Sequence, residues 1–162
     1  MKKTICLNKS TLDFMASKIT PESLVIEFGG GWSSRWFADR CGRLVVIETN
    51  VRWARLIYND LQFTRAATSV LIPPVKKLPV RADLVLIDCS EVLRFKYTQW
   101  GWPLVKPGGW ILFDDAQRPQ NGEAVTWLIE QAGKPITLVW QPGDVKSAKP
   151  RTTMAWQKNN SK

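Results

Sequence analysis

The chain has 162 residues, a formal net charge of +9 at pH 7 and no histidine. Its length predicts one domain, and its 44% hydrophobic and 23% charged residues are typical of a globular protein, which excludes a wholly disordered, collagen-like or coiled-coil chain. The absence of histidine excludes hydrolases that use Ser-His-Asp or Cys-His catalysis, and it excludes metal sites with histidine ligands.

Three further features bear on where the protein works. No apolar run reaches the roughly 18 residues that a membrane span needs, and no apolar segment follows the lysines at positions 2 and 3, so we expect neither a membrane helix nor a secretory signal. The three cysteines, Cys6, Cys41 and Cys89, are far apart, which argues against a disulfide framework and fits the reducing cytoplasm. The positive charge suggests a polyanionic partner, or serves only solubility.

Short apolar runs alternate with amphipathic stretches along the chain. The first half predicts a helix over 9–19 capped by Ser10 or Thr11, a buried strand over 23–28, a glycine turn over 29–31, a short helix from Ser33 or Ser34 to 40, a strand over 44–48, and a helix over 51–63 capped by Asn50. The second half predicts a strand over 69–72, a strand over 83–88, a helix over 91–102, a turn over 106–109, a strand over 110–114, a helix from its cap Asn121 to 132, and strands over 136–140 and 152–157. Prolines 73, 74 and 79 exclude a helix of normal length before the fourth strand.

Near-continuous apolar strands that alternate with helices are typical of a parallel sheet covered on both faces, and right-handed crossovers make such a sheet doubly wound. The predicted fold is therefore α/β, with a doubly wound, mostly parallel seven-stranded sheet in a single domain that spans residues 1–162 and has its core at about 8–157. Ligands of such sheets bind at the carboxyl ends of the strands. The residues that follow the strands are therefore the functional candidates, at 27–34, 48–50, 88–90 and 114–118.

A glycine-rich loop, VIEFGGGWSS at 25–34, follows the first predicted strand. Glycines let the backbone turn tightly and approach a ligand, and the next helix offers free N–H donors. A dinucleotide fingerprint has glycine or alanine where Ser34 stands, and Glu27 would repel a pyrophosphate, so the loop disfavours NAD and favours a ligand with a cationic group. A purely structural turn is the alternative interpretation.

Glu48 ends the second predicted strand, 17 residues after Gly31. This spacing suits a carboxylate that accepts hydrogen bonds from ribose hydroxyls. The alternative is an acid that only interacts with the dipole of the following helix. With the glycine loop in place, we favour ribose.

Five segments together resemble the Rossmann-like (class I) S-adenosylmethionine-dependent methyltransferases, in particular their small O-methyltransferase-like members. The segments are the acidic, glycine-rich loop at 27–33, Glu48, the strand DLVLID at 83–88, the turn and strand LVKPGGWILFDD at 104–115, and two final strands joined around Pro142-Gly143. The resemblance spans about residues 8–157 and implies that the last strand of the sheet is antiparallel.

The resemblance implies S-adenosylmethionine as the cofactor and assigns residues to it. The first loop would hold its amino acid part, Glu48 its ribose, and Thr49 and Asn50 would lie under the adenine, with Asp88 and Cys89 on the adenine or substrate side; the loop residues are Glu27, Gly29, Gly30, Gly31 and Ser33. Trp32 or Trp53 packs near the adenine or only in the core.

Methyl transfer from a sulfonium depends largely on positioning, and it needs a base only when the acceptor carries a proton, so a chain without histidine can catalyse it. We predict Asp88 and Asp115 as the catalytic residues. In metal-dependent relatives an Asp and an Asp-Asn pair bind Mg²⁺, and Asp88, Asp114 and Asp115 match this set except that Asp115 replaces the Asn. We favour a site without metal, in which Asp115 instead caps a turn and pairs with Arg118.

The acceptor is expected to be a hydroxyl or amine of a small molecule or of an anionic macromolecule, including nucleic acid. Small basic groups lie at 2–3, 76–77 and 146–151, and by analogy Lys146 and Lys149 lie beside the site, where they meet an anionic substrate or are simply solvated. The residues after Asp88 lack the Pro-Pro-aromatic sequence of DNA amine methyltransferases. The leading alternative is a non-catalytic methyltransferase-like module that binds nucleic acid or a protein partner, and an NAD-dependent oxidoreductase comes third. The oligomeric state stays open.

Overall fold

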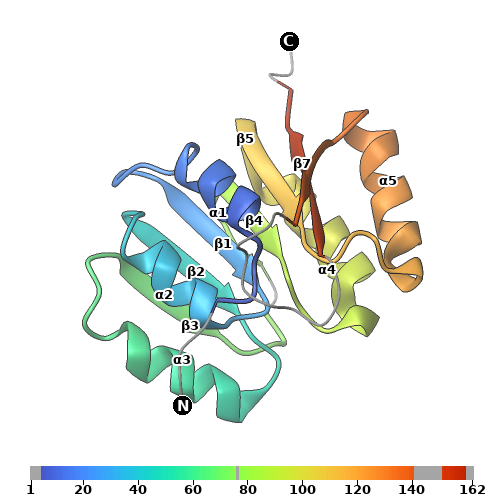
Figure 1. Cartoon of the computed structure of the whole chain (residues 1–162). Helices are drawn as coiled ribbons and strands as arrows, with labels where there is room; N and C mark the ends of the chain where they lie inside the picture. The colour runs from blue at the N-terminus through green and yellow to red at the C-terminus, as the bar shows by residue number, and fades with distance from the viewer. Residues whose placement is uncertain (1–4, 76, 141–150, 160–162) are drawn as a thin grey trace.

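The computed structural model describes residues 5–75, 77–140 and 151–159. In these residues seven strands form one sheet in the order β3-β2-β1-β4-β5-β7-β6 (Figure 1). The strands are β1 (Leu24–Phe28), β2 (Arg43–Ile47), β3 (Ala67–Leu71), β4 (Ala82–Ile87), β5 (Val105–Phe113), β6 (Ile136–Val139) and β7 (Thr152–Gln157). The pairings among β1 to β5 are parallel, whereas β7 runs antiparallel to both β5 and β6. The predicted doubly wound, mostly parallel sheet with an antiparallel last strand is confirmed.

Five helices cover the two faces of the sheet (Figure 1). They are α1 (Lys9–Ala16), α2 (Trp32–Ala38), α3 (Val51–Leu61), α4 (Glu91–Leu104) and α5 (Gly122–Ala132), and a short 3₁₀ turn, Pro119–Asn121, precedes the last. One hydrophobic core contains Met15, Phe37 and Ile57 from α1, α2 and α3, and the other contains Tyr97 and Leu128 from α4 and α5. The first three helices therefore pack on one face and the last two on the opposite face.

Alternation along the central strands supplies both cores. In β1, Leu24 and Ile26 belong to the core beneath α4 and α5, while Val25 between them belongs to the core beneath α1, α2 and α3. All residues of β1 are buried. This double burial explains why the strand is apolar at every position except Glu27, since a strand covered on both faces has no solvent-facing side.

Several predicted boundaries move by a few residues. Helix α1 ends at Ala16 and is capped by Asn8, not by Ser10 or Thr11, because the Asn8 side-chain oxygen accepts a hydrogen bond from the Thr11 amide at 2.7 Å. Asn121 makes no side-chain cap for α5, since its amide nitrogen donates to the carbonyl oxygen of Asp115 at 2.9 Å.

Strand β5 begins five residues earlier than predicted and includes the segment expected as a turn at 106–109. Its pairing with β4 shifts register between Ala82 and Leu84, so the extra residues form an irregular lead-in. On the other side, backbone hydrogen bonds join Gly108 and Gly109 to Lys158. These contacts hold the glycine-containing segment within the sheet.

The connection from β3 to β4 contains no helix in its described residues, 72–75 and 77–81, as the prolines predict. In place of a helix, Leu78 and Val80 of this connection pack against the core beneath α4 and α5. None of the helices in the described part of the protein is long and apolar enough to cross a membrane.

Candidate functional site

Four strand ends meet at one edge of the sheet. The amide of Gly29, after β1, donates to the carbonyl of Ile47 at 2.9 Å, and the amide of Asp88, after β4, donates to the carbonyl of Phe28 at 2.8 Å. The amide of Asp114, after β5, donates to the carbonyl of Ile87 at 3.1 Å. The parallel order β2-β1-β4-β5 thus brings the residues that follow these strands together, as expected for a doubly wound sheet.

The three glycines after β1 are needed for different reasons. Gly29 has φ +88, and a Cβ there would lie 2.1 Å from the carbonyl oxygen of Asp88, so the loop after β4 packs directly on its backbone. A Cβ at Gly30 would lie 2.5 Å from the Cδ1 of Ile57, inside the core. A Cβ at Gly31 would meet only the Ser33 hydroxyl, at 3.6 Å. Gly31 alone faces open space, which is the place for a ligand that approaches the backbone.

That open space is a cleft of about 300 Å³ at the amino end of α2. Its walls are Cys6, Leu7, Gly30, Gly31, Trp32, Ser33, Trp53 and Asp88. The rings of Trp32 and Trp53 meet edge to face with their centroids 5.5 Å apart, and the Trp53 indole N–H donates to the carbonyl of Gly30 at 2.7 Å. The two tryptophans therefore form an aromatic wall that is anchored to the glycine loop.

Glu48 follows β2 and contacts the glycine loop, with 8% of its surface exposed. One carboxyl oxygen accepts the amide N–H of Gly30 at 3.1 Å, and the other accepts the amide N–H of Asn50 at 2.7 Å. A carboxylate offers about four acceptor positions, so about two are left for further donors. Glu48 thus positions the glycine loop and keeps the capacity to accept hydrogen bonds from two hydroxyls.

Glu27 is fully buried beneath the loop. The hydroxyl of Ser33 donates to one of its oxygens at 2.5 Å, and the hydroxyl of Ser34 donates to the other. Burial raises the pKa of Glu27 to about 8, although the two serine hydroxyls act to lower it. Glu27 does not line the cleft, and Ser33 stands between the two, so any effect of Glu27 on a ligand passes through Ser33.

Three aspartates at the ends of β4 and β5 surround the buried guanidinium of Arg94 from α4, which is 4% exposed. Its Nη2 lies 3.1 Å from Oδ1 of Asp88 and 3.7 Å from Oδ2 of Asp115. Its Nε donates to the carbonyl of Cys89 at 2.9 Å, and its Nη1 donates to the carbonyl of Asp114. Arg94 therefore ties α4 to the loops after both strands.

Two more arginines complete this charged cluster. Arg118 lies 2.8 Å from Oδ2 of Asp115, which confirms the pairing predicted from the sequence, and Arg151 lies 3.5 Å from Oδ2 of Asp114. Burial raises the pKa of Asp114 to about 7, and the neighbouring charge of Asp88 adds to this effect. Asp115 has φ 55, a left-handed conformation that is uncommon outside glycine and that clusters at functional sites.

These ion pairs do not suit a hard cation. Arg94 occupies the space between Asp88 and Asp115, where a Mg²⁺ ion would need oxygen ligands. Within the described residues, no group of three or more Asp, Glu, Cys or His side chains is arranged to hold a metal ion. The candidate metal set Asp88, Asp114 and Asp115 is thus a network of carboxylates neutralised by arginines.

The remaining predicted residues lie around the cleft without lining it. Asn50 caps α3, with its side chain accepting from the Trp53 amide at 3.0 Å, and Thr49 is exposed beside it. Cys89 is half-buried next to Asp88, and burial raises the pKa of its thiol to about 12, so it is no nucleophile at neutral pH. Lys146 and Lys149 lie outside the described residues.

Sequence reasoning missed Arg94, and a signal for it was present. The buried positions of α4 include Arg94, Tyr97, Thr98 and Gly101, which repeat with helical spacing, so Arg94 is a charge on an otherwise inward-facing stripe. A buried charge at such a position requires partners, and acids stand at the ends of two predicted strands, 83–88 and 110–114. Trp32 and Trp53, for which the sequence leaves packing in the core as an alternative, both form part of the cleft wall.

Comparison with models of protein families gave no match, and comparison with curated proteins gave none either. Solved structures do match. An O-methyltransferase from Bacillus cereus in complex with SAH has a TM-score of 0.73 and 18% identity, covering 94% of this chain and 82% of that one. A SAM-dependent O-methyltransferase from Thermotoga maritima has a TM-score of 0.75 and 17% identity, covering 100% and 69%. A tRNA (m1A58) methyltransferase from Aquifex aeolicus has a TM-score of 0.73 and 13% identity, covering 99% and 73%. These likenesses show that the chain has the class I methyltransferase fold.

Proposed function

We propose that this chain is an S-adenosylmethionine-dependent methyltransferase, formed by one domain over residues 1–162 and working in the cytoplasm. The observation that carries the proposal is the cleft at the carboxyl ends of β1 and β4, where a side chain added at Gly31 would enter open space beside the Ser33 hydroxyl. The solved structures with this fold that bind SAH or carry methyltransferase names support the same conclusion.

The residues present fit the cofactor. Gly30, Gly31 and Ser33 would hold its amino acid part, while Gly29 and Glu27 shape the loop from below. Glu48 would accept the ribose hydroxyls with its unused acceptor positions, beside the exposed Thr49 and Asn50. Trp53 offers an aromatic surface at the same end of the cleft.

When bound, the cofactor supplies a methyl group on a positively charged sulfur that departs as a neutral thioether. The chain must hold the acceptor in line and accept its proton where it has one. Asp88 is our candidate for the group that accepts the proton, because it lines the cleft. Burial raises its pKa, although the charge of Arg94 acts to lower it. Asp115 is 3% exposed and paired with Arg94 and Arg118, so we assign it a positioning role.

We propose a hydroxyl or amine as the acceptor, on a small molecule or on an anionic macromolecule such as nucleic acid. The similar structures include O-methyltransferases, an N-methyltransferase and a tRNA methyltransferase. A non-catalytic module is the less favoured alternative, because Asp88, the candidate acid, lines the same cleft as the glycine loop.

The test is calorimetric titration with S-adenosylhomocysteine, with NAD as the control ligand. We expect a dissociation constant in the micromolar range for the former and no heat from NAD. Failure of the native chain to bind S-adenosylhomocysteine would overturn the proposal.

Two glycine variants locate the binding site. Gly31→Val should abolish binding while leaving the free energy of unfolding nearly unchanged, because its side chain enters only the cleft. Gly122→Val is the matched control, since a Cβ there has no neighbour within 4 Å, and it should bind like the native chain. Binding that persists in Gly31→Val would show that the cofactor lies elsewhere.

A further inference from the structure

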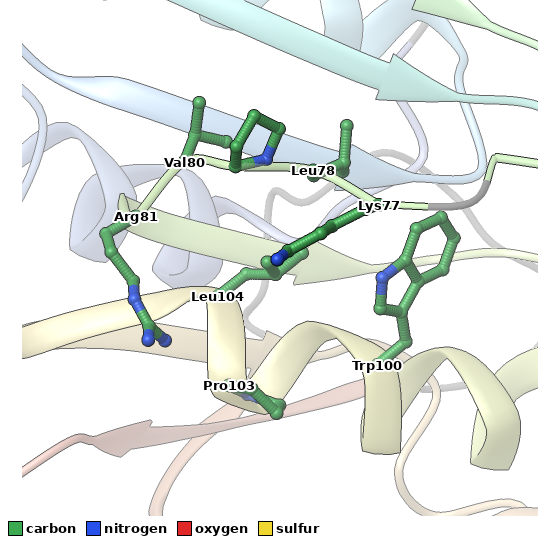
Figure 2. A pocket seen from close by; sticks show the side chains of 8 residues that line it. Lys77, Leu78, Val80, Arg81, Trp100, Pro103 and Leu104 are labelled. Atoms are coloured by element: carbon green, nitrogen blue, oxygen red, sulfur yellow. The ribbon is translucent and has the colours of Figure 1, made fainter.

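A second cleft lies outside the candidate cofactor site. It has a volume of about 340 Å³ and lies between the segment 77–81 that leads into β4 and the last turns of α4 (Figure 2). Its walls are Lys77, Leu78, Pro79, Val80, Arg81, Trp100, Pro103 and Leu104. Strand β4 begins at Ala82 and β5 at Val105, so this cleft lies toward the amino ends of the strands, whereas the glycine loop follows their carboxyl ends.

The described residues between β3 and β4 form no helix, and the cleft lies between this connection and α4. In the connection, Leu78 and Val80 pack against the core, while Lys77 and Arg81 are exposed. This alternation is that of extended chain, in which side chains two residues apart share a side. Figure 2 shows the Lys77 and Arg81 side chains extending from this segment on the side of α4.

Trp100 forms the aromatic part of the wall. It rises from α4 near Lys77 (Figure 2), and its ring is held edge-on against Phe28, with centroids 5.2 Å apart. It also contacts the ring of Tyr97, with centroids 5.8 Å apart. The indole is therefore fixed in place and half-buried, with part of its surface lining the cleft.

The charge at this cleft is positive and uncompensated. Among the described residues, neither Lys77 nor Arg81 has a hydrogen-bond or ion-pair partner, and no acid lines the cleft. The nearby Asp83 is paired with Lys106. The pKa of Lys158 is lowered by burial and then by the charge of Arg81, which shows that positive charge accumulates on this side of the protein. An anionic partner would complement it.

We propose that this second cleft binds single-stranded nucleic acid, with a base against Trp100 and phosphates on Lys77 and Arg81. Four residues of extended chain span about 13 Å, so the two cations are spaced for separate phosphates along a strand better than for one small anion. An aromatic surface beside cations is an arrangement on which bases stack without sequence preference. The net charge of +9 favours the same polyanion. This proposal is independent of the methyltransferase proposal.

The experiment measures fluorescence anisotropy of a labelled ten-nucleotide oligouridylate against the full chain over a range of salt concentrations. The double variant Lys77→Ala/Arg81→Ala should bind at least about tenfold more weakly, and its slope of log affinity against log salt should fall by about 1.4, which corresponds to two single-strand phosphate contacts. The matched control is Arg65→Ala/Lys134→Ala, which removes two exposed charges elsewhere and should keep the native slope.

Trp100→Leu tests the stacking contact and should weaken binding roughly five- to hundredfold, while Trp100→Phe should restore most of it. Thermal unfolding of each variant checks that the fold is kept. Binding of S-adenosylhomocysteine should be unchanged in the Lys77/Arg81 double variant. Loss of oligonucleotide binding and loss of cofactor binding are thus measured separately, so either proposal can fail without the other.

Several results would overturn the proposal. Native affinity and native salt slope in the Lys77/Arg81 double variant would remove the cleft as the binding site. Displacement of the oligonucleotide by polyglutamate at equal charge concentration would show a surface for any polyanion, and equally tight binding of uridine monophosphate would show a site for a single small anion.

Discussion

Glu27 illustrates how a single side chain can couple the site to pH. Its carboxyl group is fully buried, and its pKa of about 8 lies above neutrality, so the folded protein holds a proton there at pH 7. The hydroxyls of Ser33 and Ser34 each donate to one of its oxygens, and these contacts lower the pKa by less than burial raises it. Loss of that proton as pH rises therefore lowers the free energy of unfolding.

We expect Glu27→Gln to remove a pH dependence of stability. Between the ordinary pKa of about 4.5 and the folded value of about 8, the unfolded chain releases a proton that the folded protein keeps, so the free energy of unfolding falls as pH rises, by at most about 1.4 kcal/mol per pH unit. The contribution is fully present below pH 4.5 and lost as pH rises toward 8. Urea unfolding of both proteins from pH 5 to about 8.5 should show the glutamine variant gaining relative to native.

The measurement to compare is the difference in free energy of unfolding between the native protein and Glu27→Gln at each pH. The raised pKa of Asp114 makes the free energy of unfolding fall with pH in both proteins, and this effect cancels in the difference. Glu123→Gln, at an exposed glutamate of α5, is the matched control and should show a difference that does not change with pH. A constant difference for Glu27→Gln would mean that Glu27 is ionised across this range.

At the scale of elements, α4 connects the charged cluster at the candidate site with the second cleft. Its amino end follows Asp88 and Cys89, and Arg94, one turn in, reaches the ends of β4 and β5. Farther along the same helix, Trp100 forms part of the second cleft. One helix thus carries both the arginine of the charged cluster and the aromatic wall, so its placement governs both.

We expect Arg94→Met to destabilise the fold by about 3–5 kcal/mol, because it leaves buried carboxylates and two carbonyl groups without their partner. Arg94→Lys should recover little of this loss, since an ammonium cannot reproduce the forked contacts. The comparison is Arg35→Met, which removes a half-exposed pair with Asp39 and should cost under about 1 kcal/mol. Urea unfolding at pH 7 measures all three, and equal costs for Arg94→Met and Arg35→Met would contradict the bridging role.

For the whole molecule, stability is concentrated in the middle of the sheet. Strands β1 and β4 are buried almost throughout, whereas β3 and β6 are edge strands with largely exposed or half-buried residues. Regions with little buried apolar surface open at lower free energy than the core. The sites attached to β1 and β4 therefore rest on the most protected part of the fold.

Hydrogen exchange followed by mass spectrometry of fragments should reflect this gradient. Amides of β1 and β4 should exchange at least about tenfold more slowly than those of β3 and β6. Equal protection of the β3 and β4 amides would contradict the expected difference between edge and central strands. If the protection of β3 then increased with protein concentration, a second copy of the chain would be covering that edge.

The sequence predicted the fold because the informative signals are local. Apolar strand runs such as LVIEF in β1 and DLVLI in β4 report double burial, and the prolines before β4 exclude a helix without reference to any distant contact. The boundary errors arose where a tertiary contact overrides local preference. Ser10 donates to the side chain of Asn8 and to the carbonyl of Val139, so it is not available as the cap.

For the candidate site, spacing indicated which loops meet but not what each side chain does there. The distinction between Gly30, which faces Val46 and Ile57, and Gly31, which faces the cleft, depends on residues far away in the sequence. The same is true of Arg94, which meets Asp88 and Asp115 only after β4 and β5 pair. Local periodicity thus determines the order and type of the elements, whereas burial and charge pairing depend on long-range packing, and only the assembled sheet decides which acids are neutralised and which backbone stays open.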